Sequence, residues 1–175
     1  MPIKVIAGLD PASIKNIGWS IIKIDNDKLN NIEVSAGTMV MEDVEKYHEC
    51  LWPMFQAVEN FILAYKPSSL VIEKTSSFSG GFITGQVSNC MGVILCCAVK
   101  HKITIEFVYP SHVKKVLTGK GKATKSVMKK SVQGILSTML NIDKDKIKYD
   151  SEHAYDAVGN ILCYLIDGGV IKHAI

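Results

Sequence analysis

Apolar residues gather in short runs rich in valine and isoleucine near the start of the chain. These runs occupy residues 4–9, 17–24 and 32–40, and turn-forming residues separate them at 10–13 and 25–27. Short β-branched runs bounded by Asp, Asn and Pro are typical of strands. Because the connections are short, we expect three strands in an antiparallel meander.

From residue 41 the spacing changes, and apolar residues recur every three or four positions. The recurring residues are Val44, Tyr47, Leu51, Phe55, Val58, Ile62 and Leu63. This period predicts a helix. Pro53 lies inside it, so Pro53 either kinks the helix or starts a second segment.

The rest of the chain alternates between strand-like and helix-like stretches. Residues 69–73 and 103–108 are short apolar runs that predict two further strands, with an apolar helix over about 84–99 between them. Three more helices are then predicted, over 110–117, 124–140 and 151–166. A meander followed by β-α-β units implies an α/β fold, in which a mixed five-stranded sheet carries helices on both faces.

Composition narrows the class of protein. The chain has 175 residues, 47% of them apolar and 21% charged, so we expect one folded domain over residues 1–175. The longest apolar stretch is roughly half of the ~20 residues that a membrane span requires, and the N-terminus lacks the features of a signal peptide. We therefore expect a cytoplasmic protein with no membrane partner. The five cysteines lack CxxC spacing, which favours buried free thiols.

Charge is distributed unevenly. All 20 basic residues are lysine, and the formal net charge is only +3. Residues 100–148 contain 12 lysines and three acids, a local charge of +9, whereas the remainder has 8 lysines and 14 acids, a local charge of −6. Such asymmetry indicates a polyanionic partner, of which nucleic acid is the commonest and an anionic membrane surface the next.

Four candidate ligands lie at the ends of predicted strands and on the last helix. Asp10 follows the first strand, Glu73 ends the fourth, and His153 and Asp156 are three residues apart on one helix face. Burying a carboxylate without a partner is costly. Carboxylates that converge from two strands and a helix repel one another unless a metal neutralises them. Oxygen ligands with a neutral imidazole suit Mg²⁺ or Mn²⁺.

Each of these features has a simpler explanation when it is taken alone. An Asp before Pro is often a turn residue, Glu73 could pair with Lys74 at the surface, and a histidine on a terminal helix is more often structural. The combination favours a function, because the acids accompany an acid-free segment, 109–130, that contains seven lysines. Metal-binding acids beside a phosphate-binding surface are what phosphodiester hydrolysis needs.

Four motifs occur in an order that matches a known family. They are GLDPASIKNIGWSII at 8–22, LVIEK at 70–74, YPSHVKKVLTGKGKATKSVMKKSV at 109–132 and SEHAYDAVGNILCYLI at 151–166. Together they resemble the RuvC family of Holliday-junction resolvases, which has a strand ending in a catalytic Asp, a second acidic motif, a lysine-bearing helix-loop-helix and a C-terminal catalytic helix. The resemblance covers nearly the whole chain.

This resemblance implies an RNase H-like fold and a homodimer that resolves four-way DNA junctions by paired nicks. It also implies two Mg²⁺ ions in each active site, with Mn²⁺ able to substitute. Asp10, Glu73 and Asp156 match the metal-binding carboxylates, and His153 matches a fourth ligand. Lys114 and Lys125 match the lysines near the scissile phosphate and complete the expected catalytic set. The further DNA-binding candidates are Lys115, Lys120, Lys122, Lys129 and Phe78.

One departure from the family concerns the residue that wedges into the junction. Members commonly place a Phe three residues after the second acid, where this chain has Ser76. We expect Phe78 or Phe82 to take that role by stacking on an unpaired base. A phenylalanine that anchors the loop in the core or in a dimer interface is an equally open alternative.

Other interpretations also stay open. A nuclease for flaps, other branched DNA or RNA-DNA hybrids would share the fold, and a phage-type resolvase with broad branch specificity would fit the altered loop. A noncatalytic junction-binding module is a third possibility. The helix over 85–99 is apolar nearly all round, so it forms either a dimer interface or a wholly buried core helix. The sequence does not identify a branch-migration motor as a partner.

Overall fold

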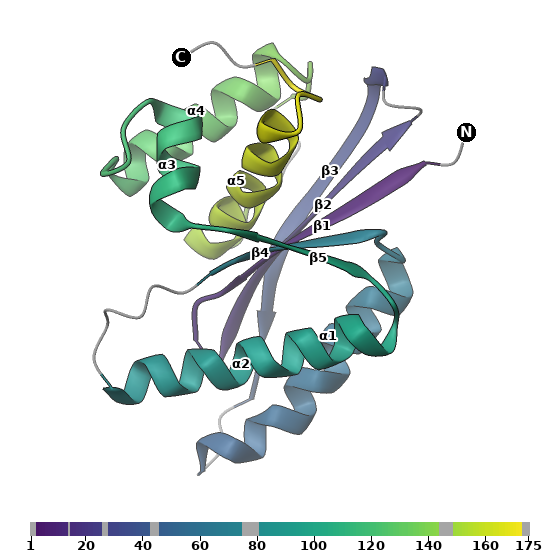
Figure 1. Ribbon diagram of the computed structural model, residues 1–175, viewed down its shortest axis with the longest axis vertical. Coiled ribbons are helices and arrows are strands. Elements are labelled where there is room, and N and C mark those ends of the chain that lie inside the picture. The colour runs from purple at the N-terminus through teal and green to yellow at the C-terminus, as the bar shows by residue number, and fades with distance from the viewer. Residues whose placement is uncertain are drawn as a thin grey trace.

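The structure is a computed structural model that describes residues 3–13, 15–25, 28–42, 46–74, 81–143 and 149–172. Its strands are β1 (Lys4–Pro11), β2 (Asn16–Asp25), β3 (Lys28–Val40), β4 (Ser69–Glu73) and β5 (Thr104–Val108). Within these described residues, a 3₁₀ helix, η1 (Tyr47–Cys50), precedes five α-helices. These are α1 (Leu51–Tyr65), α2 (Gly81–Lys100), α3 (Pro110–Thr118), α4 (Lys125–Thr138) and α5 (Glu152–Asp167), as Figure 1 shows. Phe78 and the side chain of Phe82 lie outside the described residues.

The five strands form one sheet in the order β3-β2-β1-β4-β5. β2 pairs antiparallel with both β1 and β3, and the β1–β2 register places Asp10 opposite Gly18. β4 lies parallel to both β1 and β5. The expected mixed sheet, a meander extended by two parallel strands, is therefore confirmed.

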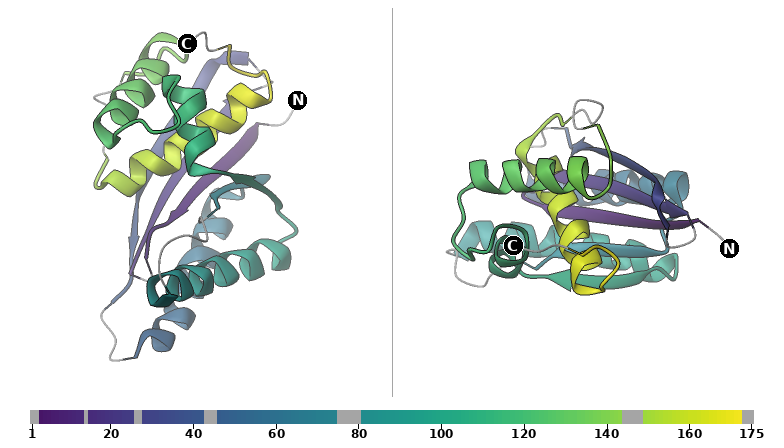
Figure 2. Two further views of the ribbon diagram at one scale, coloured as in Figure 1. Left: turned by 60° about the vertical axis from the view of Figure 1, so that its left-hand side comes forward. Right: turned by 90° about the horizontal axis from the view of Figure 1, so that it is seen from above.

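Helices cover both faces of this sheet (Figures 1 and 2). α1 and α2 pack on one face around Leu9 and Leu70, and α3, α4 and α5 pack on the other around Ile6 and Val71. Because side chains alternate along a strand, residues two apart point to the same face. Asp10, four residues after Ile6, therefore points toward α5.

Two glycines allow α5 to approach the sheet closely. A Cβ atom added at Gly8 of β1 would clash with the carbonyl oxygen of Ala157, and one added at Gly18 of β2 would clash with the carbonyl oxygen of His153. The backbone of α5 thus lies directly on these two strands. This contact brings the start of α5 next to Asp10.

Among the element boundaries that differ from the expectation, two have a clear physical reason. The turn expected at 10–13 begins later, because β1 continues through Asp10 to Pro11 and pairs with β2. The helix expected from residue 41 is instead η1 followed by α1, which begins at Leu51. Pro53 lies in the first turn of α1, where a backbone N–H has no helical acceptor to lose. It therefore marks a second segment and does not kink the helix.

α2 is neither wholly buried nor wholly apolar on its surface. Cys90, Ile94 and Cys97 are buried, whereas Val99 is 70% exposed. The alternative of a wholly buried core helix is therefore wrong. Four of the five cysteines are buried thiols, as expected, while Cys96 is exposed. Within the described ranges, no helix is both long and apolar enough to cross a membrane.

Candidate active site

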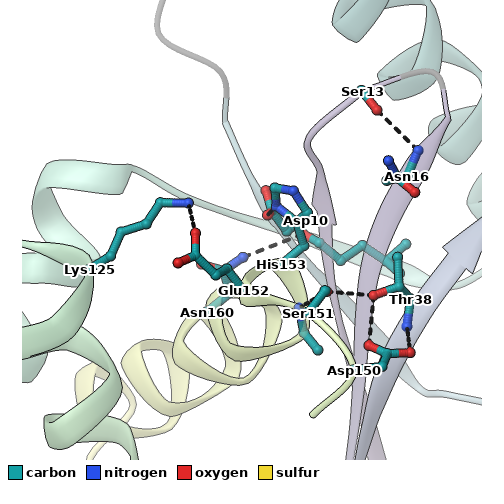
Figure 3. A network of polar contacts seen from close by, with 12 residues as sticks. Asp10, Ser13, Asn16, Thr38, Lys125, Asp150, Ser151, Glu152, His153 and Asn160 are labelled. Carbon is teal, nitrogen blue, oxygen red and sulfur yellow. Dashed lines mark hydrogen bonds and ion pairs between the residues drawn. The ribbon is translucent and has the colours of Figure 1, made fainter.

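The site begins with a contact between a strand and a helix. Asp10 is only 8% exposed, and its Oδ2 atom lies 3.1 Å from Nδ1 of His153, in the first turn of α5 (Figure 3). This hydrogen bond is the main reason that the pKa of His153 is raised above its ordinary value. The helix and the strand thus share one polar pair at the point where they touch.

A third group comes from the next turn of α5. Asp156 follows His153 by three residues, so both side chains project from one face of the helix. One ligand atom from each of Asp10, His153 and Asp156 lies within 4.8 Å of the others. Burial raises the pKa of Asp156, and the nearby charge of Asp10 raises it further.

Glu73 completes the group from the neighbouring strand. It ends β4, which is parallel to β1, and lies two residues after Val71, so it points to the same face as Asp10. Burial raises the pKa of Glu73 to about 7, with further contributions from Asp10 and Asp156. These carboxylates therefore share a small, partly desolvated volume.

Two lysines face this group of acids. Lys114 of α3 and Lys125 of α4 line a pocket of about 260 Å³ together with Asp10, Glu73, His153 and Asp156. The positive charges of Lys114 and Lys125 act to lower the pKa of Glu73, although burial outweighs them. All six residues expected to be catalytic are thus brought to one pocket.

The other lysines expected to bind DNA lie outside this pocket. Lys115, Lys120, Lys122 and Lys129 are exposed, and none of them is among the described residues that line it. Lys129 instead extends over the ring of Tyr155, with its Nζ atom 4.7 Å from the ring centre. It lines a neighbouring pocket of about 390 Å³, which shares Lys125 and Asp156 with the first.

Several positioning residues were not evident from the sequence. The Ser151 hydroxyl accepts a hydrogen bond from the Ala154 backbone and caps α5. Asp150 accepts hydrogen bonds from the backbone N–H and the hydroxyl of Thr38 on β3, at 2.9 and 2.8 Å (Figure 3). Only the serine at the start of the last predicted helix was a signal, because serine is a preferred N-cap residue.

Two further contacts involve α5: one joins it to β1, and the other joins it to Lys125 of α4. The Asn160 side chain on α5 donates to the carbonyl oxygen of Leu9 at 3.4 Å (Figure 3). Glu152 forms an ion pair with Lys125, with 2.8 Å between Nζ and Oε2. Both partners of that pair are more than half exposed, so the pair adds little to stability.

The donor set fits divalent metal ions. Three carboxylates and one imidazole converge on a pocket in which the nearby charge of Asp10 adds to burial in raising the pKa values of Glu73 and Asp156. A divalent cation would relieve this repulsion, and carboxylate oxygens are the ligands that Mg²⁺ and Mn²⁺ prefer. Asp10, Glu73, His153 and Asp156 are the residues that could hold such ions.

The sequence is similar to one family of known proteins. A family model described as crossover junction endodeoxyribonuclease RuvC matches residues 6–164. The protein of that name from Petrotoga mobilis is 28% identical over 160 residues, which cover 91% of this chain and 92% of the relative. The one from Hydrogenovibrio crunogenus is 29% identical over 162 residues, covering 93% of this chain and 87% of the relative.

A solved structure shows the same fold. The structure of Thermus thermophilus RuvC in complex with a Holliday junction substrate has a TM-score of 0.77 and 20% sequence identity, and covers 97% of this chain and 98% of that one. The RNase H-like α/β architecture expected from the motifs is therefore confirmed. Since the family model spans nearly the whole chain, this protein belongs to the RuvC family of crossover junction endodeoxyribonucleases.

Proposed function

We propose that this crossover junction endodeoxyribonuclease resolves four-way DNA junctions by paired, symmetric nicks at the pocket between β1, β4 and α5. The convergence of Asp10, His153 and Asp156, with ligand atoms within 4.8 Å of one another, carries this proposal. Nucleases of this family generally depend on metal ions, and the pocket offers a ligand set of the kind that such ions require. The chain would act in the cytoplasm, where its DNA substrate lies.

The acids and the histidine have distinct roles in this proposal. Asp10, Glu73 and Asp156 bind two Mg²⁺ ions, for which Mn²⁺ can substitute, and His153 binds as a neutral imidazole. Ions bound by these residues would supply activation of a water molecule and charge stabilisation of the departing 3′ oxygen. The hydrogen bond from His153 to Asp10 orients both side chains before any ion is present.

The lysines hold the DNA backbone. Lys114 and Lys125 reach the metal pocket itself, so they contact the scissile phosphate. The exposed lysines Lys115, Lys120, Lys122 and Lys129 hold phosphates on either side. Lysine lacks the planar fork with which arginine reads guanine. Recognition should therefore depend on the backbone shape of the DNA more than on its base sequence.

Paired nicking requires two active sites, so we propose that the working enzyme is a homodimer. The two pockets would cut strands of like polarity at one junction. The exposed side chains of α2, Val99 among them, make that helix the leading candidate for the contact between protomers. Sedimentation with and without junction DNA tests this assembly directly.

The activity is tested on four substrates of matched sequence: a four-way junction, a flap, a linear duplex and an RNA-DNA hybrid. Each is incubated with Mg²⁺, with Mn²⁺ or with EDTA. We expect symmetric, ligatable nicks in the junction alone, and none in EDTA. Cleavage of the flap or the hybrid at the rate of the junction would instead establish a broader nuclease of the same superfamily. Junction binding without any cleavage would indicate a binding module.

A further inference from the structure

A second group of metal-ligating side chains lies at the opposite end of α5 from the catalytic pocket. Asp167 is the last residue of α5, and Cys163 lies one turn before it on the same face. His112 approaches from α3, with its Nε2 atom 2.8 Å from Oδ2 of Asp167. The thiol of Cys163 donates to the same oxygen at 3.6 Å. One ligand atom from each residue lies within 4.8 Å of the others.

The position of Asp167 calls for a cation. The carbonyl groups at the C-terminus of a helix carry partial negative charge, so a carboxylate there is disfavoured unless a positive group compensates it. The last turn of α5 contains no basic residue. Within the described part of the chain, the ion-pair partner of Asp167 is His112, which is positive only when it is protonated.

The three donor atoms are of the kinds that a zinc-class ion prefers. Thiolate sulfur and imidazole nitrogen suit Zn²⁺ and similar transition metals, whereas Mg²⁺ prefers oxygen. Zn–ligand bonds of about 2.0–2.3 Å in a tetrahedron separate neighbouring ligand atoms by roughly 3.3–3.6 Å. The separation between Cys163 and Asp167 already matches, at 3.6 Å. The separation between His112 and Asp167, 2.8 Å, must widen slightly.

The surroundings permit this small adjustment. The side chains of His112 and Asp167 are 49% and 46% exposed, so both can move, and water can reach a fourth coordination position. Cys163 is fully buried, so its sulfur atom is a fixed third ligand position of the tetrahedron. Burial raises the pKa of Cys163 to about 12, so its thiol is protonated in the absence of metal.

We propose that Cys163, His112 and Asp167 form a second metal site, which binds one zinc-class transition-metal ion with water as the fourth ligand. The ion replaces the thiol proton, which passes to the buffer, and the sulfur becomes a thiolate ligand. The bound ion joins α3 to α5. Because Lys114 lies two residues after His112, the ion would also steady the helix that carries this lysine.

Titration of the full-length protein with Co²⁺ tests the site. A cobalt–thiolate bond gives a strong near-ultraviolet charge-transfer band. No cysteine is among the described residues that line the catalytic pocket, so Co²⁺ bound there does not produce this band. We expect this band to rise to saturation as Co²⁺ is added and to disappear when Zn²⁺ is added in competition. The Asp10→Asn variant should keep the band.

Variants separate this site from other thiols. His112→Ala removes an exposed ligand and should weaken Zn²⁺ binding by more than the ~10–100-fold that loss of an outer-shell partner costs. Cys163→Ala should abolish the band. Cys96→Ser, at the exposed cysteine, is the matched control and should leave the band unchanged. The proposal is overturned if wild type gives no band, if His112→Ala binds as tightly as wild type, or if Cys96→Ser loses the band.

Discussion

Thr38 on β3 and Asp150, directly before α5, are joined by two hydrogen bonds although 112 residues separate them in the chain. The backbone N–H and the hydroxyl of Thr38 each donate to one oxygen of the Asp150 carboxylate. The Thr38 hydroxyl also lies 2.5 Å from the hydroxyl of Ser151, the N-cap of α5. This network fixes the start of α5 against the sheet, and therefore fixes where His153 meets Asp10.

Replacing Thr38 with valine removes the hydroxyl and keeps the shape of the side chain. We expect a loss of about 0.5–1.5 kcal/mol in the free energy of unfolding, because the hydroxyl's hydrogen bond to one carboxylate oxygen of Asp150 is lost. Junction cleavage should fall as well, since His153 is less firmly placed. Chemical denaturation and a cleavage assay measure the two effects. Ser35→Ala, at an exposed position of the same strand, is the control and should change neither quantity.

Gly18 tests how closely α5 must approach the sheet. A methyl group there meets the backbone of His153, so Gly18→Ala should destabilise the fold by about 1–3 kcal/mol or more and displace His153. Gly92, in the middle of α2, has open space around its Cβ position. Gly92→Ala should therefore be neutral or stabilising by up to about 1 kcal/mol. Equal stability of the two variants in thermal unfolding would contradict this picture of the helix–sheet contact.

The stability of the metal-free protein should fall as the pH rises. The folded-state pKa of Glu73 is about 7, against an ordinary value of 4.5, so the folded state binds the proton more tightly than the unfolded state. The stabilising contribution of Glu73 to folding is fully present below its ordinary pKa of 4.5, and it is lost as the pH rises through about 7. The change amounts to at most about 3 kcal/mol. Asp156 shifts in the same direction.

Thermal unfolding in EDTA across this pH range measures the effect. Glu73→Gln should flatten the dependence, because the neutral amide does not titrate. Adding Mg²⁺ should raise the stability most at the higher pH, where the carboxylates are charged and can bind it. If thermal stability in EDTA instead rises with pH, to the same extent in wild type and in Glu73→Gln, the carboxylates do not destabilise the folded state as proposed.

DNA binding should weaken steeply with salt, because we propose that the exposed lysines hold phosphates and so release counterions when DNA binds. Each contact that is lost should reduce the slope of log K against log salt concentration by about 0.9. We expect Lys122→Ala to show this reduction, with similar losses for junctions of different sequence. Lys23→Ala is the control, since Lys23 is paired with Glu33 on the sheet. If the slope for Lys122→Ala equals that of wild type, Lys122 does not contact the DNA backbone.

The sequence was sufficient to predict the strands of the sheet and to place Asp10 and Glu73 at strand ends, because both predictions depend on local patterns. β-branched runs predicted all five strands, and the strand ends located Asp10 and Glu73. The contacts that orient α5 could not be predicted in this way. The bonds from Thr38 to Asp150 and from Asn160 to Leu9 join residues far apart in the chain, and neither residue type signals its partner.

Element boundaries were wrong where tertiary contacts outweigh local preference. Asp10-Pro11 has the composition of a turn, yet pairing with β2 extends β1 through both residues. The apolar period from residue 41 continues through η1 into α1, and the period alone does not distinguish one helix from two segments. The boundary lies just before Pro53, whose position in a first turn costs no hydrogen bond.

The most direct test of the proposed active site is the cleavage of a synthetic four-way junction by the Asp10→Asn variant. The amide keeps the size of the side chain and removes the charge that we propose holds metal. We expect the variant to bind the junction within about twofold of wild type, and to cut it at least about a thousandfold more slowly in Mg²⁺. Glu33→Gln, which alters a surface carboxylate, should cut like wild type. If Asp10→Asn still cuts the junction at a rate comparable to wild type, the catalytic centre is not this pocket.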